Sequence, residues 1–263
     1  MKRFLFVACG LLSLAASAKD VAPTSHLSAA QIVDKNVAAR GGLQAWRAVN
    51  TLSMSGQIDA GGKTDAKLPF VMSMKRPHKS RFELRFREQT AVQVYDGTQG
   101  WKVRPFLGRD EVEPYTPAEA KSAAGMTELD GPLVDYAAKG IKVELQGMDK
   151  VEGHSAYKLK LTMKNQEERH LWVDASSFLE LKIDGEPRKL DGRMHNVAIY
   201  YRDYKTEHGL TVPYLLETVV EGAKPSRKMT IQHVSVNQPM DDVYFARPSA
   251  GAQGALPVQP AGG

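Results

Sequence analysis

The chain is 263 residues long, 42% of its residues are hydrophobic, and its formal net charge at pH 7 is +5. This length allows a sizeable core in one large all-β domain or in two small domains. The positive excess is small and is not concentrated in a basic stripe, which argues against nucleic acid as a partner.

Residues 1–18 have the pattern of a secretory signal peptide. A basic start and an apolar run over residues 4–14 are followed by small residues up to Ala18, where cleavage is expected. Removing this segment takes away two basic residues and no acidic one, which leaves a net charge of +3. No later run approaches the roughly 20 apolar residues of a transmembrane helix.

Cys9 is the only cysteine, and it lies inside the predicted signal peptide. The mature chain is therefore expected to have no disulfide and no thiol chemistry. Lipidation at Cys9 is the alternative. It is less favoured because only a few apolar residues precede Cys9, and cleavage there would leave the hydrophobic residues 10–18 exposed.

Residues 19–27 are expected to form a flexible lead, followed by a single domain over residues 28–248. Ser28 and Gln31 have the spacing of a capping box, which predicts a helix that ends near Gly41-Gly42. Strands are then expected at residues 51–59, 66–74 and 80–87, with Gly61-Gly62 as the first turn.

The clearest hairpin signal lies at residues 94–101, where Asp96-Gly97 separates two apolar-alternating segments. Thr116-Pro117, with Glu119 three residues after the threonine, predicts a helix start, and Gly131-Pro132 with the apolar residues that follow predicts a second short helix. Further strands are expected at residues 141–145, 157–163, 169–174, 179–183, 194–204, 212–221 and 227–236. Residues 249–263, rich in Gly, Pro, Ala and Gln, are expected to be a disordered tail.

These elements predict a mainly β (α+β) fold, with one antiparallel sheet of about eleven strands. Alternation of Phe82, Leu84 and Phe86 with charged residues gives the sheet one apolar face and one charged face. Such a sheet has more apolar face than a few short helices can cover. Either a second sheet packs on it or a cavity remains.

Motifs for catalysis, metals and nucleotides are missing from the sequence. The seven histidines include no pair at the spacing of four that joins metal ligands on one helix face, so no metal site is expected. There is no Gly-x-Ser-x-Gly elbow and no glycine-rich phosphate loop, so neither catalytic residues nor a cofactor are predicted. Asp241-Asp242 is interpreted as a capping pair rather than as paired catalytic carboxylates.

The order of short motifs resembles the LolA/LolB-like periplasmic lipoprotein-carrier superfamily, and most of all its outer-membrane lipoprotein-sorting proteins. The resemblance covers about residues 29–248. It implies a strongly curved antiparallel sheet that forms an unclosed barrel, with helices lidding a concave apolar face that holds acyl chains. The matching segments are residues 39–46 leading into 51–56, 95–101, 153–159, 172–174, 204–213 and 236–245.

The leading hypothesis is a non-enzymatic carrier or binding protein in the periplasm, with the sorting of lipoproteins to the outer membrane as its candidate role. Its partners would be a lipid or an acylated protein, together with inner- or outer-membrane proteins. An envelope stress-sensing or partner-binding module on the same fold is the alternative, and an enzyme that uses the cavity is the third. The predicted acyl-binding residues on one face of the sheet are Leu68, Phe70, Met72, Phe82, Leu84, Phe86, Trp101 and Val103, with Leu133, Val134 and Tyr136 as the lid.

Overall fold

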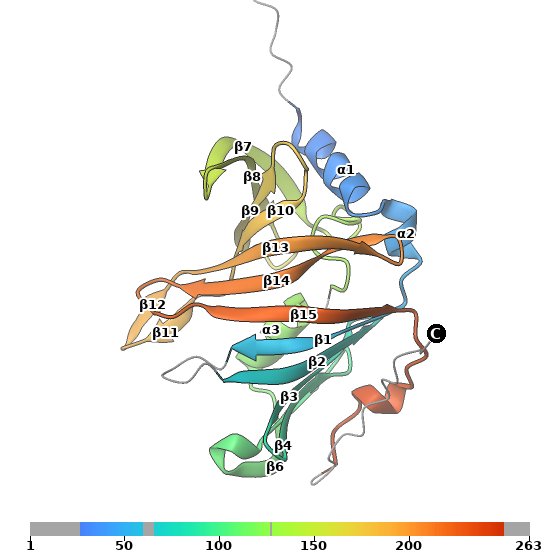
Figure 1. Ribbon diagram of the computed structural model, residues 1–263, viewed down its shortest axis with the longest axis vertical. Coiled ribbons are helices and arrows are strands. Elements are labelled where there is room, and N and C mark those ends of the chain that lie inside the picture. The colour runs from blue at the N-terminus through green and yellow to red at the C-terminus, as the bar shows by residue number, and fades with distance from the viewer. Residues whose placement is uncertain (1–26, 60–65, 127, 250–263) are drawn as a thin grey trace, which may run out of the picture.

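The computed structural model describes residues 27–59, 66–126 and 128–249 (Figure 1). The predicted signal peptide, the lead up to residue 26, the Gly61-Gly62 turn and the tail from residue 250 lie outside the described residues.

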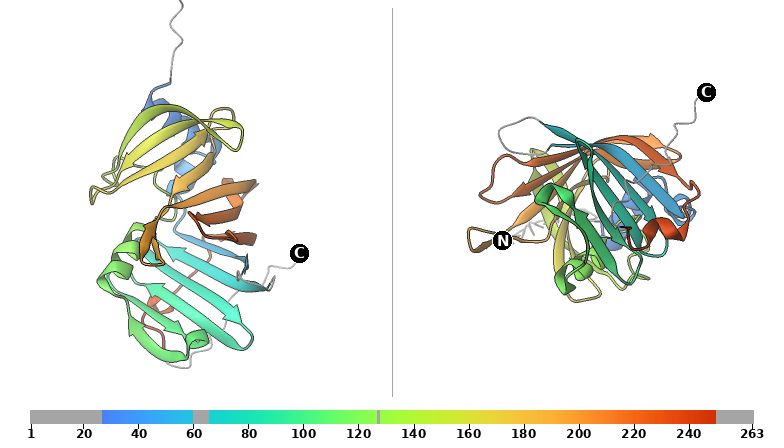
Figure 2. Two further views of the ribbon diagram at one scale, coloured as in Figure 1. Left: turned by 90° about the vertical axis from the view of Figure 1, so that its left-hand side faces the viewer. Right: turned by 90° about the horizontal axis from the view of Figure 1, so that it is seen from below.

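One antiparallel sheet of 13 strands forms the body of the molecule, in the order β6-β5-β4-β3-β2-β1-β15-β14-β13-β10-β9-β8-β7. Its two edges, β6 and β7, do not pair with each other, so the strongly curved sheet stays open (Figure 2). The predicted mainly β, unclosed architecture is confirmed. The strands are β1 (Thr51–Asp59), β2 (Lys67–Lys75), β3 (Lys79–Phe86), β4 (Gln89–Tyr95), β5 (Gly100–Arg104), β6 (Arg109–Pro114), β7 (Lys142–Val151), β8 (His154–Thr162), β9 (Glu168–Asp174), β10 (Glu180–Asp184), β13 (Val197–Glu207), β14 (Leu210–Val220) and β15 (Arg227–Val236).

Two short strands, β11 (Arg188–Leu190) and β12 (Arg193–His195), form a separate two-stranded sheet. Neither β6 nor β11 was predicted, because both lack the apolar alternation that marks a half-buried strand.

Three α-helices accompany the sheet in the described part of the chain: α1 (Ala29–Ala39), α2 (Leu43–Arg47) and α3 (Pro117–Met126). Ser28 and Gln31 form the predicted capping box at α1. Glu119 and Thr116 bond each other's backbone N–H groups at α3 in the same way. Two 3₁₀ turns, η1 (Pro105–Leu107) and η2 (Asp242–Phe245), complete the secondary structure. No helix in the described residues is long and apolar enough to cross a membrane.

The helix predicted after Gly131-Pro132 is wrong, because residues 129–140 form consecutive turns instead. Positive φ angles at Gly131 (78°), Asp135 (51°) and Gly140 (73°) break the run of right-handed conformation that a helix needs.

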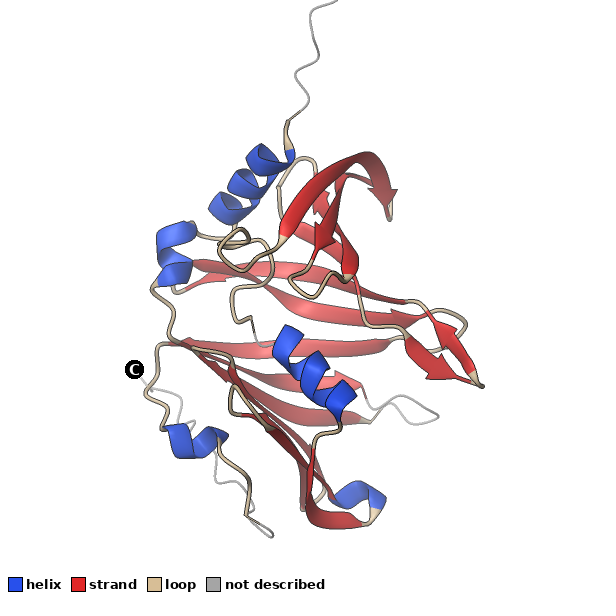
Figure 3. Ribbon diagram, turned by 180° about the vertical axis from the view of Figure 1, so that it is seen from behind, coloured by secondary structure: helices blue, strands red, loops and turns tan. Residues whose placement is uncertain are grey.

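The hydrophobic core lies on the inner face of the curved sheet. Ile32 and Val33 of α1, Trp46 of α2 and Leu133 of the turn segment pack there against strand residues from both halves of the sheet. The helices therefore cover the concave side, as predicted. Figure 3 shows α3 crossing the same side over the half that contains β1 to β5.

Candidate ligand-binding face

The register of β3, β2, β1 and β15 aligns apolar side chains in rows across the inner face. Directly opposed residues of antiparallel strands point to the same side of the sheet. One row therefore runs from Phe82 through Met72 and Met54 to Val234. A second row runs from Leu84 through Phe70 and Gly56 to Ile231, and a third from Leu68 through Ile58 and Met229 to Leu216.

The second row has room only for glycine at position 56. A Cβ at this position would lie 2.0 Å from the backbone oxygen of Thr230, at a bulge where the register between β1 and β15 shifts. Phe70 and Ile231 therefore flank a position without a side chain.

This apolar face is only partly covered. Phe70 and Ile231 are buried, whereas Met72, Phe82 and Leu84 are half-buried and pack at the margin of the core. The same holds for Met54, Leu216 and Met229. These six side chains and Leu68, which is also half-buried, form one continuous set across β3, β2, β1, β15 and β14, which we call the inner apolar face.

Helix α3 lies over this half of the sheet but is held chiefly by polar contacts. Its side chains through Ala124 are half-buried or exposed, and none is buried. Lys102 of β5, which shares the inner face with Phe82 through Gln93, pairs with Glu119 of α3. Burial of Glu119 alone would raise its pKa, but the hydrogen bonds from Lys102 and Thr116 bring the pKa below its ordinary value.

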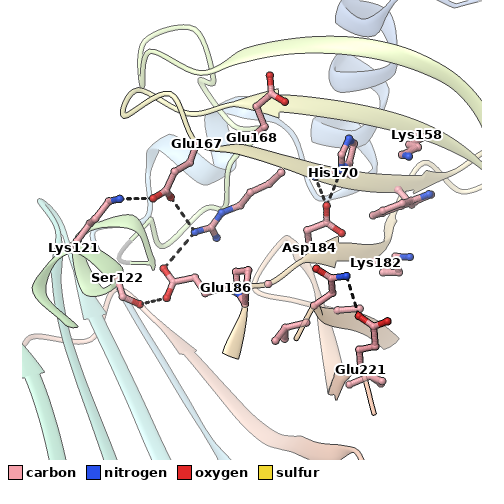
Figure 4. Close-up of a pocket in the computed structure, with 18 of the residues that line it drawn as sticks. Lys121, Ser122, Lys158, Glu167, Glu168, His170, Lys182, Asp184, Glu186 and Glu221 are labelled. Carbon is pink, nitrogen blue, oxygen red and sulfur yellow. Dashed lines mark hydrogen bonds and ion pairs between the residues drawn. The ribbon is translucent and has the colours of Figure 1, made fainter. Parts of the chain in front are cut away.

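The other side of α3 reaches the opposite half of the sheet. Lys121 Nζ lies 2.5 Å from Glu167 Oε1, and Ser122 Oγ donates to Glu186 Oε2 over 2.7 Å (Figure 4). Arg169 continues this chain between Glu167 and Glu186. Because α3 is tied to both halves, it bridges the opening of the curved sheet.

Leu68, Phe70, Met72, Phe82, Leu84 and Phe86 share one face, which is the inner one, as the alternation predicted. Phe86 lies at its edge, is 37% exposed and makes an edge-to-face contact with Phe106.

The prediction that Trp101 and Val103 share this face is wrong. Trp101 opposes Val94, which opposes Arg81, and Val103 opposes Val92, so these residues point to the outer face. On that face η2 packs on β3, where Arg81 lies 4.7 Å from the ring centre of Tyr244. The length of the four-residue connection between β4 and β5 decides which side chains of β5 point to the inner face. Alternation within a single strand does not reveal this, because it does not extend across the hairpin.

Leu133, Val134 and Tyr136 do contact the inner core, but not as a helical lid. Leu133 is 1% exposed and Val134 is fully buried, so both belong to the packed core. Tyr136 is half-buried beside them. The described element that crosses the opening is α3.

Sequence reasoning missed Met54, Leu216 and Met229 as members of the inner apolar face. Their alternation within the predicted strands was visible, but which strands become neighbours was not. β1 pairs with β15, which is distant in the chain, and only that pairing places these residues together.

A surface pocket of about 1090 Å³ lies beside α3 and the strands β8, β9, β10 and β13. Its charged lining includes Lys121, Lys158, Glu167, Arg169, Lys182 and Glu186, and several of these side chains neutralise one another. No predicted acyl-binding residue lines it, and its charges do not favour an acyl chain. The described residues contain no group of three or more His, Cys, Asp or Glu side chains placed to hold a metal ion.

No protein-family model matches the sequence, and no curated protein shows significant sequence similarity to it. Similar solved structures exist nonetheless. A LolA superfamily protein from Nitrosomonas europaea matches with a TM-score of 0.54 and 14% identity, covering 84% of this chain and 98% of that one. A DUF1329 family protein from Desulfovibrio piger matches with a TM-score of 0.55 and 14% identity, over 84% of this chain and 98% of that one.

A domain named for outer membrane lipoprotein sorting, from Vibrio parahaemolyticus, matches with a TM-score of 0.54 and 13% identity, over 82% of this chain and 95% of that one. All three matches extend over nearly the whole of the solved chain, although sequence identity is low. The open, strongly curved sheet with its inner helices is therefore the LolA-like fold.

Proposed function

We propose that this protein is a non-enzymatic binding module that holds the acyl chain of a lipid or lipoprotein against its inner apolar face. The observation that carries the proposal is the continuous set of half-buried Met, Phe and Leu side chains on that face, beneath a helix that buries none of its described side chains. Displacing α3 would expose this surface, and an acyl chain would cover it again.

Binding of an acyl chain to this face requires no polar or charged group. Burial of an acyl chain stabilises a complex by about 0.8 kcal/mol per methylene group. Met54, Met72 and Met229 have flexible, polarizable side chains, which adapt to chains of different length. An apolar face of this composition therefore suits a ligand class better than a single ligand.

The comparisons support the proposal at the level of fold, since one similar structure is named for lipoprotein sorting. The predicted signal peptide supports a place in the periplasm, where such a module would meet lipids and acylated proteins.

Titration with a fluorescent fatty acid tests the proposal by comparing the same substitution on the inner and on the outer face of the sheet. Leu84→Arg places a charge on the inner apolar face, and Val103→Arg places the same charge on the outer face; both residues are half-buried. We expect Leu84→Arg to weaken binding at least about tenfold, because a charge in an apolar site is strongly unfavourable. Val103→Arg should bind like the parent.

Met72→Gln is a gentler inner-face change in case Leu84→Arg does not fold, and circular dichroism identifies the folded variants. Equal binding by the parent, Met72→Gln and a folded Leu84→Arg would overturn the proposal. So would a parent that binds no fatty acid.

A further inference from the structure

We propose that the β11–β12 hairpin is a contact element for the surface of an anionic membrane. The hairpin is the separate two-stranded sheet described above, and it projects from the body beyond one end of β13 and β14 (Figure 1). Asp191 and Gly192, with φ angles of 48° and 79°, form its tight turn, which is the conformation that a two-residue hairpin loop requires.

The hairpin carries two exposed apolar side chains at its end. Leu190 is 38% exposed and Met194 is 64% exposed. Leu190 is directly opposed to Arg193, and Met194 to Lys189, so each apolar side chain has a cationic neighbour on its own face. Because the apolar groups lie on both faces, the end of the hairpin is suited to entering a surface edge-on.

The cations of the hairpin are not neutralised by the protein. Arg188, Lys189 and Arg193 are exposed, and within the described ranges none of them forms an ion pair with a carboxylate. Asp191 is the acidic residue of the hairpin, so residues 188–195 carry an excess of two positive charges.

The neighbouring turn between β14 and β15, residues 221–227, carries Lys224 and Arg227 against Glu221 and so adds one net positive charge to this end. The Glu221 N–H donates to the Asn196 backbone oxygen over 2.9 Å, and a Cβ on Gly222 would lie 3.6 Å from His195 Nδ1. These contacts hold the turn against the base of the hairpin. Lys224 and Arg227 of this end are exposed and, among the residues described, have no carboxylate partner.

Exposed apolar groups flanked by unpaired cations match the interface of a bilayer that contains anionic lipids. The apolar side chains enter the boundary between headgroups and acyl chains, while the cations stay level with the phosphates. The occupant we infer is therefore a phospholipid bilayer with anionic headgroups. This inference stands on the hairpin alone and does not depend on what the inner apolar face binds.

Co-sedimentation with vesicles tests it, with the protein beginning at Lys19 and vesicles of phosphatidylcholine with or without phosphatidylglycerol. We expect binding to the anionic vesicles only, weakened by salt. Arg188→Gln/Lys189→Gln/Arg193→Gln should weaken it at least about tenfold, since each cation near an anionic surface contributes separately. Leu190→Ser/Met194→Ser should also weaken it.

Matched control variants distinguish a role of the hairpin from a general effect of losing surface charge or surface hydrophobicity. Lys142→Gln/Lys150→Gln/Lys164→Gln removes three exposed charges from the β7–β9 end, and Leu107→Ser/Met148→Ser removes two apolar side chains that are 65% and 54% exposed. Both controls should bind vesicles like the parent. An environment-sensitive dye on Met194→Cys should shift to the blue on anionic vesicles, whereas the same dye on Met148→Cys should not.

Vesicle binding that is unchanged in the hairpin variants, or a dye at position 194 that stays in water, would overturn the inference. Capture of an acidic protein without vesicle binding would also overturn it. Fatty-acid titration of the same hairpin variants keeps the two proposals apart, because these variants should retain acyl binding even when vesicle binding is lost.

Discussion

Asp130 is the residue on which the turn segment 129–140 is anchored. The residue is 1% exposed, and its carboxylate pairs with Arg76 over 2.7 Å and with Lys139, while its backbone oxygen accepts from Arg40. Removing one partner of a buried network leaves the other charges without compensation. The residue therefore joins the turn between β2 and β3 to Arg40 at the end of α1.

We expect Asp130→Ala to lower the free energy of unfolding by about 3 kcal/mol, measured by urea denaturation. Asp135→Asn is the control in the same segment, because Asp135 pairs with Arg47, whose side chain is 51% exposed, and Asn tolerates the positive φ of 51° at this position as Asp does. That exposed pair should cost less than about 1 kcal/mol. Equal losses in the two variants would contradict this account of the segment.

The ion pairs of Asp242, in the C-terminal turn η2, make the stability of the protein depend on pH. Hydrogen bonds from Lys75 and Lys79 lower the pKa of Asp242 from 3.8 to about 2. Because the folded pKa is the lower one, the stabilisation is present above pH 3.8 and is lost as the pH falls toward about 2. Urea midpoints of the parent and of Asp242→Asn should differ most above about pH 4 and converge near pH 2. A difference that grows with acidity would be contrary to this assignment.

At the scale of elements, α3 combines a capped first turn with side chains that are not buried. Glu119→Ala removes the capping partner of Thr116 and the partner of Lys102. We expect amide exchange in residues 118–124 to rise at least about fivefold, which corresponds to the roughly 1 kcal/mol of a lost cap.

Exchange in β1, β2 and β15 should stay unchanged in that variant, because their hydrogen bonds do not involve α3. Hydrogen exchange followed by mass spectrometry measures both regions at once. A parallel rise in the strands would show that α3 is an integral part of the core and not a separately held cover.

The elements with strong local signals could be predicted from the sequence. The capping residues Ser28 and Glu119 determine two helix starts, and Asp96 accepts from the N–H groups of Thr98 and Gln99 in the predicted hairpin. The turn segment could not be predicted, because the positive φ lies at Asp135, which is not glycine, and its partner Arg47 is far away in the chain. Local patterns determine most elements, and distant contacts determine the exceptions.

For the molecule as a whole, an open sheet with one apolar side could be predicted, but the composition of that side could not. Phe82 and Leu84 fall on the inner face because alternation is local. Trp101 falls on the outer face because its placement depends on the register of the hairpin. The contribution of Met229 depends on the pairing of β15 with β1, which joins the two ends of the chain.

The central claim is that the inner apolar face binds acyl chains, and light-activated cross-linking of a diazirine fatty acid tests it most directly. Mass spectrometry of the labelled peptides should locate saturable cross-links at Met54, Met72, Leu84 or Met229, and an excess of unlabelled fatty acid should abolish them. Labelling that is not saturable, or that falls on the outer-face residues Val92, Trp101 and Val103 instead, would contradict the account.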